Sequence, residues 1–187
     1  MSKIIASVFL TLDGVMEDPG GAEGFEYGGW QIPFFDDDMG RFMSEQLAAA
    51  DALLLGRVTY EGFAAAWPTI PDQDPYALKM NSMPKYVASR TLTSPTWNAT
   101  VLKGDVADEV ARLKAQPGQN LLVFGSGEFA NSLRGHNLID EYQLLVHPIV
   151  LGSGKRYFRG GIDTSTLKLI DTKTTSMGVV ILTYQPA

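Results

Sequence analysis

The order in which strand-like and helix-like segments follow one another constrains the fold of this chain most strongly. Over the first two thirds, apolar runs typical of strands alternate with segments whose apolar residues recur every three or four positions, as in helices. In the last third, strand-like segments follow one another directly and end in a pair at 166–173 and 177–184. Alternation favours a parallel sheet covered by helices, and consecutive strands favour antiparallel pairing. We therefore predict an α/β fold whose central mixed, mostly parallel sheet ends in antiparallel strands.

The individual elements are bounded by turn and capping signals. Asp105 is a predicted N-cap, and the Pro117-Gly118 pair ends the helix that it begins. There is no internal repeat and no low-complexity linker, so residues 1–187 are predicted to form a single domain. The other strands are predicted at 3–12, 51–56, 85–90, 99–104, 121–124 and 140–150, and helices are predicted to begin near 36, 57, 76, 105 and 128.

Composition and charge exclude several classes of function. The net charge of −6 and a pI near 4.8 argue against nucleic acid and anionic membrane surfaces as partners, because the overall field repels phosphate groups. Without cysteine there is no disulfide, zinc–thiolate site or thiol nucleophile, and two histidines are too few for a histidine cluster, so no metal site is expected. The apolar run at the N-terminus is too short to span a membrane and does not resemble a signal peptide. A cytoplasmic protein is expected.

The stretch "LLVFGSGEFANSL" at 121–133 is a strand, a glycine turn and the start of a helix, an arrangement that can hold a phosphate group or simply turn the chain. It matches the loose G-x-G-x-x-[GA] dinucleotide pattern, but the acid that should follow about 20 residues later is missing. The Rossmann interpretation therefore fails. A simpler hypothesis is that backbone N–H groups at the start of the helix face a pyrophosphate; the residues concerned are Phe124, Gly125, Ser126, Gly127, Glu128 and Phe129.

Two more strand ends carry groups suited to phosphate. "GRVT", comprising Gly56, Arg57, Val58 and Thr59, puts an arginine in the first turn of a helix, which the helix dipole disfavours unless Glu61 or an anionic ligand lies nearby. Ligands of open α/β sheets bind beyond the carboxyl ends of strands. The third such end carries a hydroxyl and a second arginine, a pair that alone would be ordinary surface in most proteins. Together these groups suit a dinucleotide with an extra phosphate, NADP rather than NAD; the third pair is Ser89 and Arg90.

Five motifs, in order along nearly the whole chain, resemble the dihydrofolate reductase-like superfamily. The resemblance is greatest to the reductase domain of the riboflavin-pathway deaminase/reductase, the RibD C-terminal domain. It implies a dihydrofolate reductase-like three-layer fold, NADPH as the cofactor, a small-molecule heterocyclic substrate and a homodimer. The motifs are "TLDG" at 11–14, "GRVTYE" at 56–61, "VASR" at 87–90, "VFGSGEF" at 123–129 and "VHPIVLGSG" at 146–154.

The same resemblance implies roles for individual residues toward the cofactor. Arg57 would meet the phosphate on the adenosine side and Thr59 the pyrophosphate. Ser89 and Arg90 would hold the 2′-phosphate, and residues 125–128 would lie under the pyrophosphate.

Candidates on the substrate side are fewer. Asp13 ends the first strand next to the expected nicotinamide and is a candidate catalytic and substrate-binding residue, although it could equally be an ordinary turn residue. Trp30 belongs to a glycine-aromatic segment at 19–30 that covers the active site in this family. Asp38 is a candidate substrate-binding acid, although helix capping by itself explains its cluster, 36–38. The proton could come from Asp13, from that cluster or from an ordered water.

The predicted function is an NADPH-dependent reductase that transfers hydride to a C=N or C=O of a pteridine- or pyrimidine-like molecule. It resembles 5-amino-6-(5-phosphoribosylamino)uracil reductase or dihydrofolate reductase. The chain departs from the riboflavin-pathway pattern by carrying Ser7 in place of a usual lysine and Thr11 in place of a serine, and it lacks a deaminase zinc signature. The alternative is a non-catalytic nucleotide-binding or regulatory module on the same fold. A purely structural protein would leave Arg57 and Arg90 unexplained.

Overall fold

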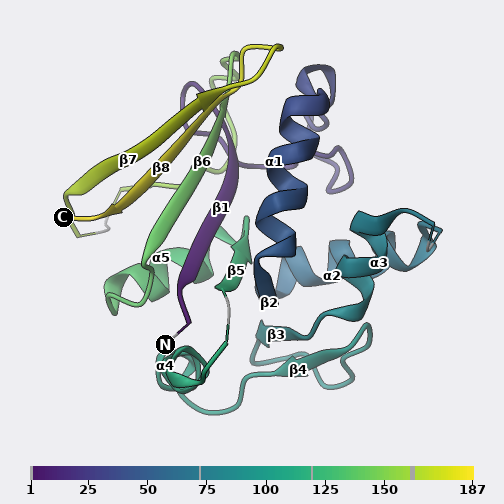
Figure 1. Cartoon of the computed structure of the whole chain (residues 1–187), viewed down its shortest axis with the longest axis vertical. Coiled ribbons are helices and arrows are strands. Elements are labelled where there is room, and N and C mark those ends of the chain that lie inside the picture. The colour runs from purple at the N-terminus through teal and green to yellow at the C-terminus, as the bar shows by residue number, and fades with distance from the viewer. Residues whose placement is uncertain (1, 72, 119, 161–162) are drawn as a thin grey trace.

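The computed structural model of this chain describes residues 2–71, 73–118, 120–160 and 163–187. Its strands and helices follow one another as the sequence predicts (Figure 1). The strands are β1 (Ile4–Thr11), β2 (Ala50–Gly56), β3 (Lys85–Ala88), β4 (Ala99–Val101), β5 (Asn120–Phe124), β6 (Glu141–His147), β7 (Leu167–Thr174) and β8 (Val180–Pro186). The helices are α1 (Asp37–Ala48), α2 (Arg57–Ala66), α3 (Pro75–Ser82), α4 (Val106–Ala115) and α5 (Gly127–Gly135), with 3-10 turns at Ile32–Phe34 and Trp67–Thr69.

The strands form one mixed sheet. Among the described residues it has eight strands in the order β4-β3-β2-β5-β1-β6-β8-β7. Every pair from β4 to β6 is parallel, whereas β8 runs antiparallel to both of its neighbours. This confirms the predicted mostly parallel sheet with antiparallel strands at its C-terminal end. The central strand β1 is apolar and almost wholly buried, as expected for a parallel strand covered on both faces.

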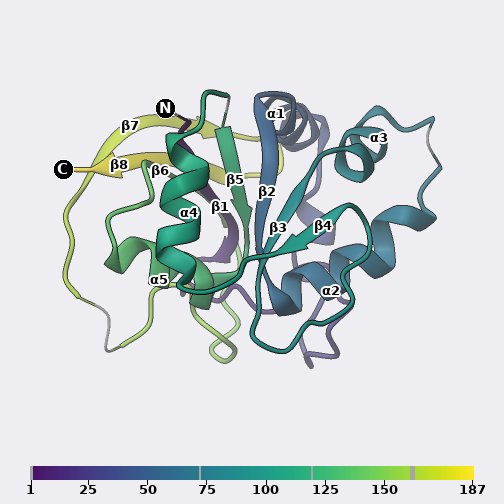
Figure 2. The ribbon, with the colours of Figure 1, turned by 90° about the horizontal axis from the view of Figure 1, so that it is seen from below.

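Helices cover both faces of the parallel part of the sheet, which makes the predicted three layers. Leu47 of α1, Tyr60 of α2 and Met80 of α3 pack against one face. Val110 of α4 and Leu133 of α5 pack against the other. Figure 2 shows α4 and α5 on the opposite side of the strands from α1 and α3. The carboxyl ends of the parallel strands remain open between these layers, at the edge where α2 and α5 begin.

Capping groups account for where several helices begin. Asp36 accepts a hydrogen bond from the N–H of Met39, and Asp105 accepts one from the N–H of Asp108, so both act as the predicted N-caps. Asp74 caps α3 in the same way, with Pro75 in its first turn. Within the described residues, none of the helices combines the length and the apolar character that crossing a membrane requires.

Several predicted strands were too long at their carboxyl ends, and the one predicted at 85–90 ends at Ala88. The segment predicted at 99–104 is a strand only over Ala99–Val101, because Gly104 adopts a positive φ of 82° and leads into the N-cap of α4. The segment predicted at 140–150 ends at His147, since Pro148 has no N–H with which to continue the ladder. These shortened ends release residues into the loops that follow.

Candidate functional site

A cleft of about 1470 Å³ lies at the carboxyl edge of the parallel strands. Its walls are the ends of β2, β3 and β4, the first turns of α2, α4 and α5, part of the loop after β1, and the segment 155–159. This is the edge at which ligands of open α/β sheets bind, because loops and helix N-termini converge there. The cleft is large enough for a dinucleotide-sized ligand.

The structure brings most of the predicted cofactor-binding residues together in this cleft. Of the twelve, only Phe124 and Gly125 do not line it. Phe124 packs against Phe63 in the core, with ring centroids 6.2 Å apart, and the Gly125 N–H donates to the Ser7 carbonyl at 2.9 Å. The ten that line the cleft are Gly56, Arg57, Val58, Thr59, Ser89, Arg90, Ser126, Gly127, Glu128 and Phe129.

The glycine turn between β5 and α5 has a left-handed backbone. Gly125 and Ser126 have φ values of 52° and 49°. No side chain among the described residues caps the N-terminus of α5, because the Ser126 Oγ instead accepts from the Gly56 N–H at 3.0 Å. A Cβ added to Gly127 would lie 2.5 Å from the Met16 Sδ. The positive φ of Gly125 favours glycine there, and the turn leaves the first N–H groups of α5 at the wall of the cleft.

The N-terminus of α2 lies beside the same turn. The Thr59 Oγ1 lies 3.8 Å from where a Cβ of Gly125 would be. The Arg57 Nε pairs with the Glu61 Oε1 at 2.7 Å, and its Nη1 bonds the Thr91 hydroxyl. The sequence left Glu61 or a ligand as the anionic neighbour of Arg57, and Glu61 is present. Because both side chains of this pair are about half exposed, the guanidinium can still face an anion in the cleft.

Two cations of the cleft have no partner among the residues that the structure describes. Arg90 follows β3 and Lys103 follows β4, and in the described part of the chain neither side chain makes an ion pair or hydrogen bond. Val87 pairs with Val101 in the parallel ladder, so both cations leave the same end of neighbouring strands. The Ser89 Oγ accepts from the N–H groups of Thr91 and Leu92 and keeps its own hydrogen free to donate.

Sequence reasoning passed over Lys103, which lies in the segment predicted as a strand at 99–104. The rule that selected Arg90, a cation just past the carboxyl end of a parallel strand, selects Lys103 equally well once β4 ends at Val101. Met16 was also missed. Its contact with the glycine turn joins segments about 110 positions apart, for which a single sequence gives no signal.

Basic side chains exceed acidic ones around the cleft, although the whole chain carries a net charge of −6. Several are paired: Lys155 with Glu17 at 3.3 Å and Arg159 with Glu128 at 3.2 Å. Burial and the nearby carboxylate of Asp18 raise the pKa of Glu23, which also lines the cleft. Among the described residues the cleft has six Lys and Arg side chains against four Asp and Glu; the basic ones are Arg57, Arg90, Lys103, Lys155, Arg156 and Arg159.

Asp13 is not among the residues that line the cleft. Its carboxylate accepts from the Thr11 hydroxyl at 2.6 Å and from the N–H groups of Leu151 and Gly152 at 3.2 and 2.8 Å. These hydrogen bonds, that from Thr11 foremost, lower the pKa of Asp13 to about 2. The Arg156 Nε donates to the Asp13 carbonyl at 2.9 Å, and its guanidinium lies 3.6 Å from the carboxylate. Asp13 thus fixes the loop 151–156, which supplies Arg156 to the cleft.

The other two substrate-side candidates also lie outside the cleft. Trp30 is buried, donates from Nε1 to the Glu17 carbonyl at 2.7 Å, and meets the His147 ring edge-on at 5.1 Å. Asp38 accepts from the Ser176 N–H at 3.1 Å and pairs with Arg41 at 3.4 Å. Asp38 therefore ties α1 to the β7–β8 hairpin, and Trp30 anchors the end of the 19–30 segment.

Comparisons with known proteins agree with this architecture. The family model described as the RibD C-terminal domain matches residues 2–182. YyaP, an uncharacterized protein of Bacillus subtilis (strain 168), is 32% identical over 185 residues, which cover 97% of this chain and 94% of YyaP.

Solved structures show the same fold. A putative riboflavin biosynthesis protein from Shewanella sp. PV-4 superposes with a TM-score of 0.79 at 21% identity, covering 99% of each chain. Dihydrofolate reductase from Enterococcus faecalis, in complex with NADP(H), superposes with a TM-score of 0.63 at 14% identity, covering 98% of this chain and 96% of that one. By its match to the family model over nearly its whole length, this chain belongs to the RibD C-terminal domain family.

Proposed function

We propose that this protein is an NADPH-dependent reductase that transfers hydride to a C=N or C=O group of a pteridine- or pyrimidine-like small molecule. The observation that carries the proposal is the joint placement of two helix N-termini and two unpaired cations along one cleft. The Enterococcus dihydrofolate reductase, which has the same fold, was solved with NADP(H).

The residues of the cleft fit the three phosphates of NADPH. The N–H groups at the start of α5 and the Thr59 hydroxyl face the pyrophosphate, with Arg57 at its adenosine side. Arg90, Lys103 and the free hydrogen of the Ser89 hydroxyl would hold the 2′-phosphate, because both cations leave the same end of neighbouring strands and neither has a partner among the described residues. NADH lacks that phosphate, so this end of the cleft selects NADPH.

When bound, NADPH supplies the hydride, and the protein contributes binding, orientation and exclusion of water. Asp13 acts here as a positioning residue: with a pKa of about 2 its carboxylate is ionised at neutral pH, so it holds Arg156 and the loop 151–156 instead of donating a proton. Glu23, whose pKa is raised, is the carboxyl of the cleft better suited to carry a proton. Trp30 and Asp38 stay predictions as substrate contacts.

The experiment that tests the function is to mix the purified protein with NADPH and a panel of pterin, pyrimidine and flavin-type acceptors and to follow the loss of absorbance at the reduced nicotinamide band. Oxidation of NADPH that depends on both protein and acceptor supports the proposal. Saturable NADPH binding without turnover across the whole panel would favour the alternative, a non-catalytic nucleotide-binding module. Absence of NADPH binding would contradict both.

A further inference from the structure

Met16 brings an oxidisable sulfur to the wall of the cleft at which α5 begins. Its Sδ lies 2.5 Å from where a Cβ of Gly127 would be, so the thioether packs directly against the first residue of α5. Its Cε lies 4.0 Å from the corresponding position at Gly125. Met16 is half-buried and lines the cleft, so a small solute that enters the cleft can reach its side chain.

The main chain around Met16 is held by the other wall of the cleft. The Met16 N–H donates to the Lys155 carbonyl at 2.8 Å, and Val15 forms an antiparallel bridge with Arg156. The carboxylate of Glu17 accepts from the Lys155 N–H at 2.8 Å. Because the backbone is fixed on both sides of Met16, the thioether can leave the glycine turn only by a change of rotamer.

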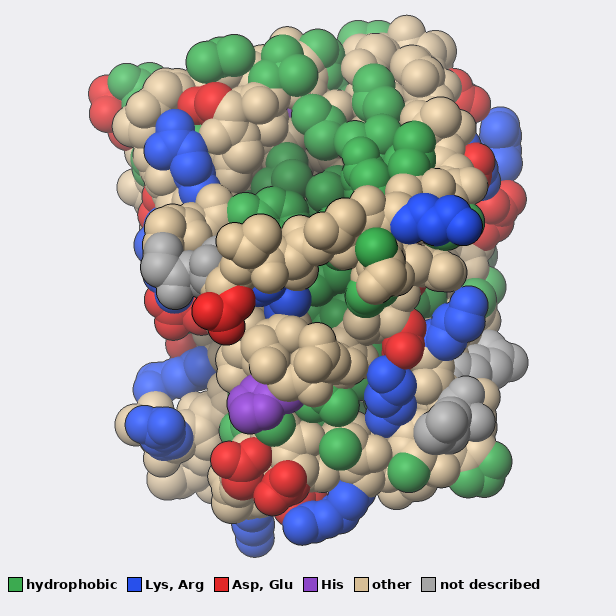
Figure 3. All heavy atoms as spheres, turned by 90° about the vertical axis from the view of Figure 1, so that its left-hand side faces the viewer, with side chains coloured by type: hydrophobic (Ala, Val, Ile, Leu, Met, Phe, Trp, Pro, Cys, Tyr) green, Lys and Arg blue, Asp and Glu red, His purple; other side chains and the backbone are tan. Residues whose placement is uncertain are grey.

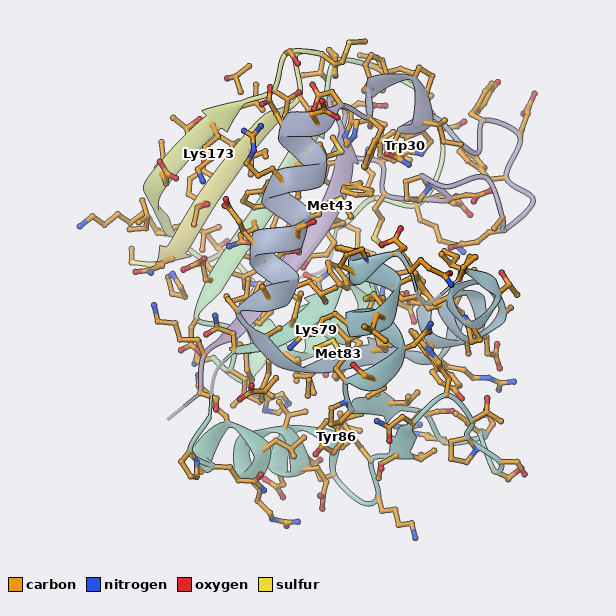
Figure 4. All side chains as sticks on the ribbon, turned by 45° about the vertical axis from the view of Figure 1, so that its right-hand side comes forward. Trp30, Met43, Lys79, Met83, Tyr86 and Lys173 are labelled. Atoms are coloured by element: carbon orange, nitrogen blue, oxygen red, sulfur yellow. The ribbon has the colours of Figure 1, made fainter. Side chains whose placement is uncertain are left out.

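The other methionines in the described part of the chain do not share this position. Met43 is half-buried on α1 (Figure 4), and Met177, in the turn between β7 and β8, is 47% exposed; neither lines the cleft. Figure 3 shows that hydrophobic side chains gather on the side of the molecule where β7 and β8 lie, so exposed apolar groups are not peculiar to the cleft. What distinguishes Met16 is its contact with α5. Three further methionines are buried in the core: Met39, Met80 and Met83.

Oxidation of Met16 would make this contact polar. A peroxide transfers one oxygen atom to a thioether: an S–O bond forms, the O–O bond breaks, the sulfur is oxidised by two electrons and, with hydrogen peroxide, water leaves. Met16 also packs against the apolar core cluster around Phe129, where a sulfoxide oxygen is disfavoured. The first N–H groups of α5 have no intrahelical acceptor, and no described side chain caps them. A sulfoxide oxygen at Met16 is therefore drawn toward these N–H groups.

We propose that Met16 is a site of reversible oxidation by peroxide, and that its sulfoxide oxygen accepts hydrogen bonds from the N–H groups at the start of α5. These are the N–H groups that face the pyrophosphate in the proposed function, on which the consequence for NADPH rests. The sulfoxide and the pyrophosphate compete for the same donors, so oxidation weakens cofactor binding. By linkage, bound NADPH slows the oxidation. Methionine sulfoxide reductases return the sulfoxide to the thioether.

Hydrogen peroxide treatment of the full chain, kept short enough that the buried methionines stay unmodified, tests the proposal. Peptide mass spectrometry shows which methionines have gained an oxygen atom. Oxidised wild-type protein is expected to bind NADPH roughly tenfold more weakly, and methionine sulfoxide reductases are expected to restore its affinity. The affinity of Met16→Leu should be the same before and after peroxide, whereas the matched control Met177→Leu should lose affinity as the wild type does. Saturating NADPH should slow the oxidation of Met16 and leave that of Met177 unchanged.

The amide signals of Gly127 and Glu128 in nitrogen–proton correlation spectra test the contact without the cofactor. Peroxide is expected to move both signals to lower field in the wild type and to leave them in place in Met16→Leu. If the unoxidised protein binds no NADPH, the proposed function fails, and these signals still show whether the sulfoxide reaches α5.

Three results would overturn the proposal. The first is unmoved amide signals in protein whose Met16 is fully oxidised. The second is a Met16 that stays unmodified while Met177 is fully oxidised, and the third is an NADPH affinity that survives complete oxidation of Met16. Circular dichroism shows whether Met16→Leu is folded. If it is not, oxidised wild-type protein before and after reductase treatment provides the same comparison.

Discussion

The Ser126 Oγ accepts a hydrogen bond from the Gly56 backbone N–H at 3.0 Å, and this bond joins the two turns from which α2 and α5 start. It fixes two helix N-termini side by side at the ends of neighbouring parallel strands. Ser126 has a left-handed backbone and does not cap its own helix, so its hydroxyl serves the neighbouring turn. The spacing of the phosphate-binding groups in the proposed site depends on this contact.

Replacing Ser126 with alanine should therefore weaken both stability and binding. The Gly56 N–H loses its partner, which costs about 1 kcal/mol of unfolding free energy, and NADPH affinity should fall several-fold as the two turns separate. Denaturant unfolding and NADPH titration measure the two effects. Ser126→Gly is the matched control for the left-handed backbone, because it lacks the hydroxyl but accepts that conformation without strain. A Ser126→Ala protein as stable as the wild type would show that the contact contributes nothing.

The unpaired cations predict how the protein distinguishes NADPH from NADH. Arg90→Ala should raise the dissociation constant for NADPH roughly 10- to 100-fold, and Lys103→Ala roughly tenfold, because each removes a charge-assisted contact to the 2′-phosphate. Affinity for NADH, which lacks that group, should be unchanged in both variants. Arg112→Ala, on the exposed surface of α4, controls for the loss of one positive charge. Equal losses for NADPH and NADH would place these two side chains elsewhere on the cofactor.

Asp13 predicts a specific dependence of stability on acid. Its folded-state pKa of about 2 lies below the ordinary value of 3.8, so the stability that it contributes is fully present above about pH 4 and is lost as the pH falls toward 2. The difference in unfolding free energy between the wild type and Asp13→Asn should be constant from pH 5 to 8 and should shrink below pH 4.

We also expect the ionisation of Asp13 to leave the pH dependence of the turnover rate unchanged between pH 5 and 8. The pH profile of the wild-type turnover rate could show an ionisation between pH 5 and 8 that is missing from the profile of Asp13→Asn. That result would contradict the positioning role, because Asp13 would then be the group that exchanges the proton.

Lys85 predicts that stability also rises with pH in the alkaline range, because a cost disappears there. It is fully buried at the start of β3, where its Nζ donates to the Asn81 carbonyl at 3.0 Å and lies 4.0 Å from the centroid of the Trp97 ring. Burial lowers its pKa from 10.5 to about 8, so the charged form costs stability below pH 8, and that cost disappears as the pH rises toward 10.5. The wild type should gain about 2–3 kcal/mol between pH 7 and pH 10 relative to Lys85→Met.

Lys79, on α3 (Figure 4), provides the control for this titration. Lys79→Met likewise replaces one lysine with methionine, at a half-buried position instead of a fully buried one. If the unfolding free energies of the wild type and Lys85→Met changed with pH in parallel, the lowered pKa of buried Lys85 would be contradicted.

Much of the fold could be predicted from local sequence patterns. The alternation of strands and helices gave the direction of each parallel strand, and Asp36 and Asp105 marked helix starts correctly because an N-cap contacts its own helix. The spatial order of the strands, in which β5 lies between β2 and β1, could not be predicted. It depends on packing between distant segments, which leaves no periodic signal.

In the candidate site, too, features that depend on local sequence were predicted and features that depend on distant contacts were not. The glycine turn and Arg57 were found because strand ends are readable from the sequence. The partners of Asp13 at 151–152 lie about 138 positions away along the chain. Its contact with that loop could therefore not be predicted, and the sequence left both a turn role and a substrate role open.

The affinity for NADPH of a variant that lacks both predicted phosphate-binding arginines tests the central claim most directly. Arg57→Ala/Arg90→Ala is compared with Arg41→Ala/Arg112→Ala, in which both arginines are exposed and lie outside the cleft. We predict saturable binding by the wild type and the control, seen as a change in NADPH fluorescence, and at least about a hundredfold weaker binding by the cleft variant. A cleft variant that folds and binds NADPH as tightly as the wild type would contradict the account.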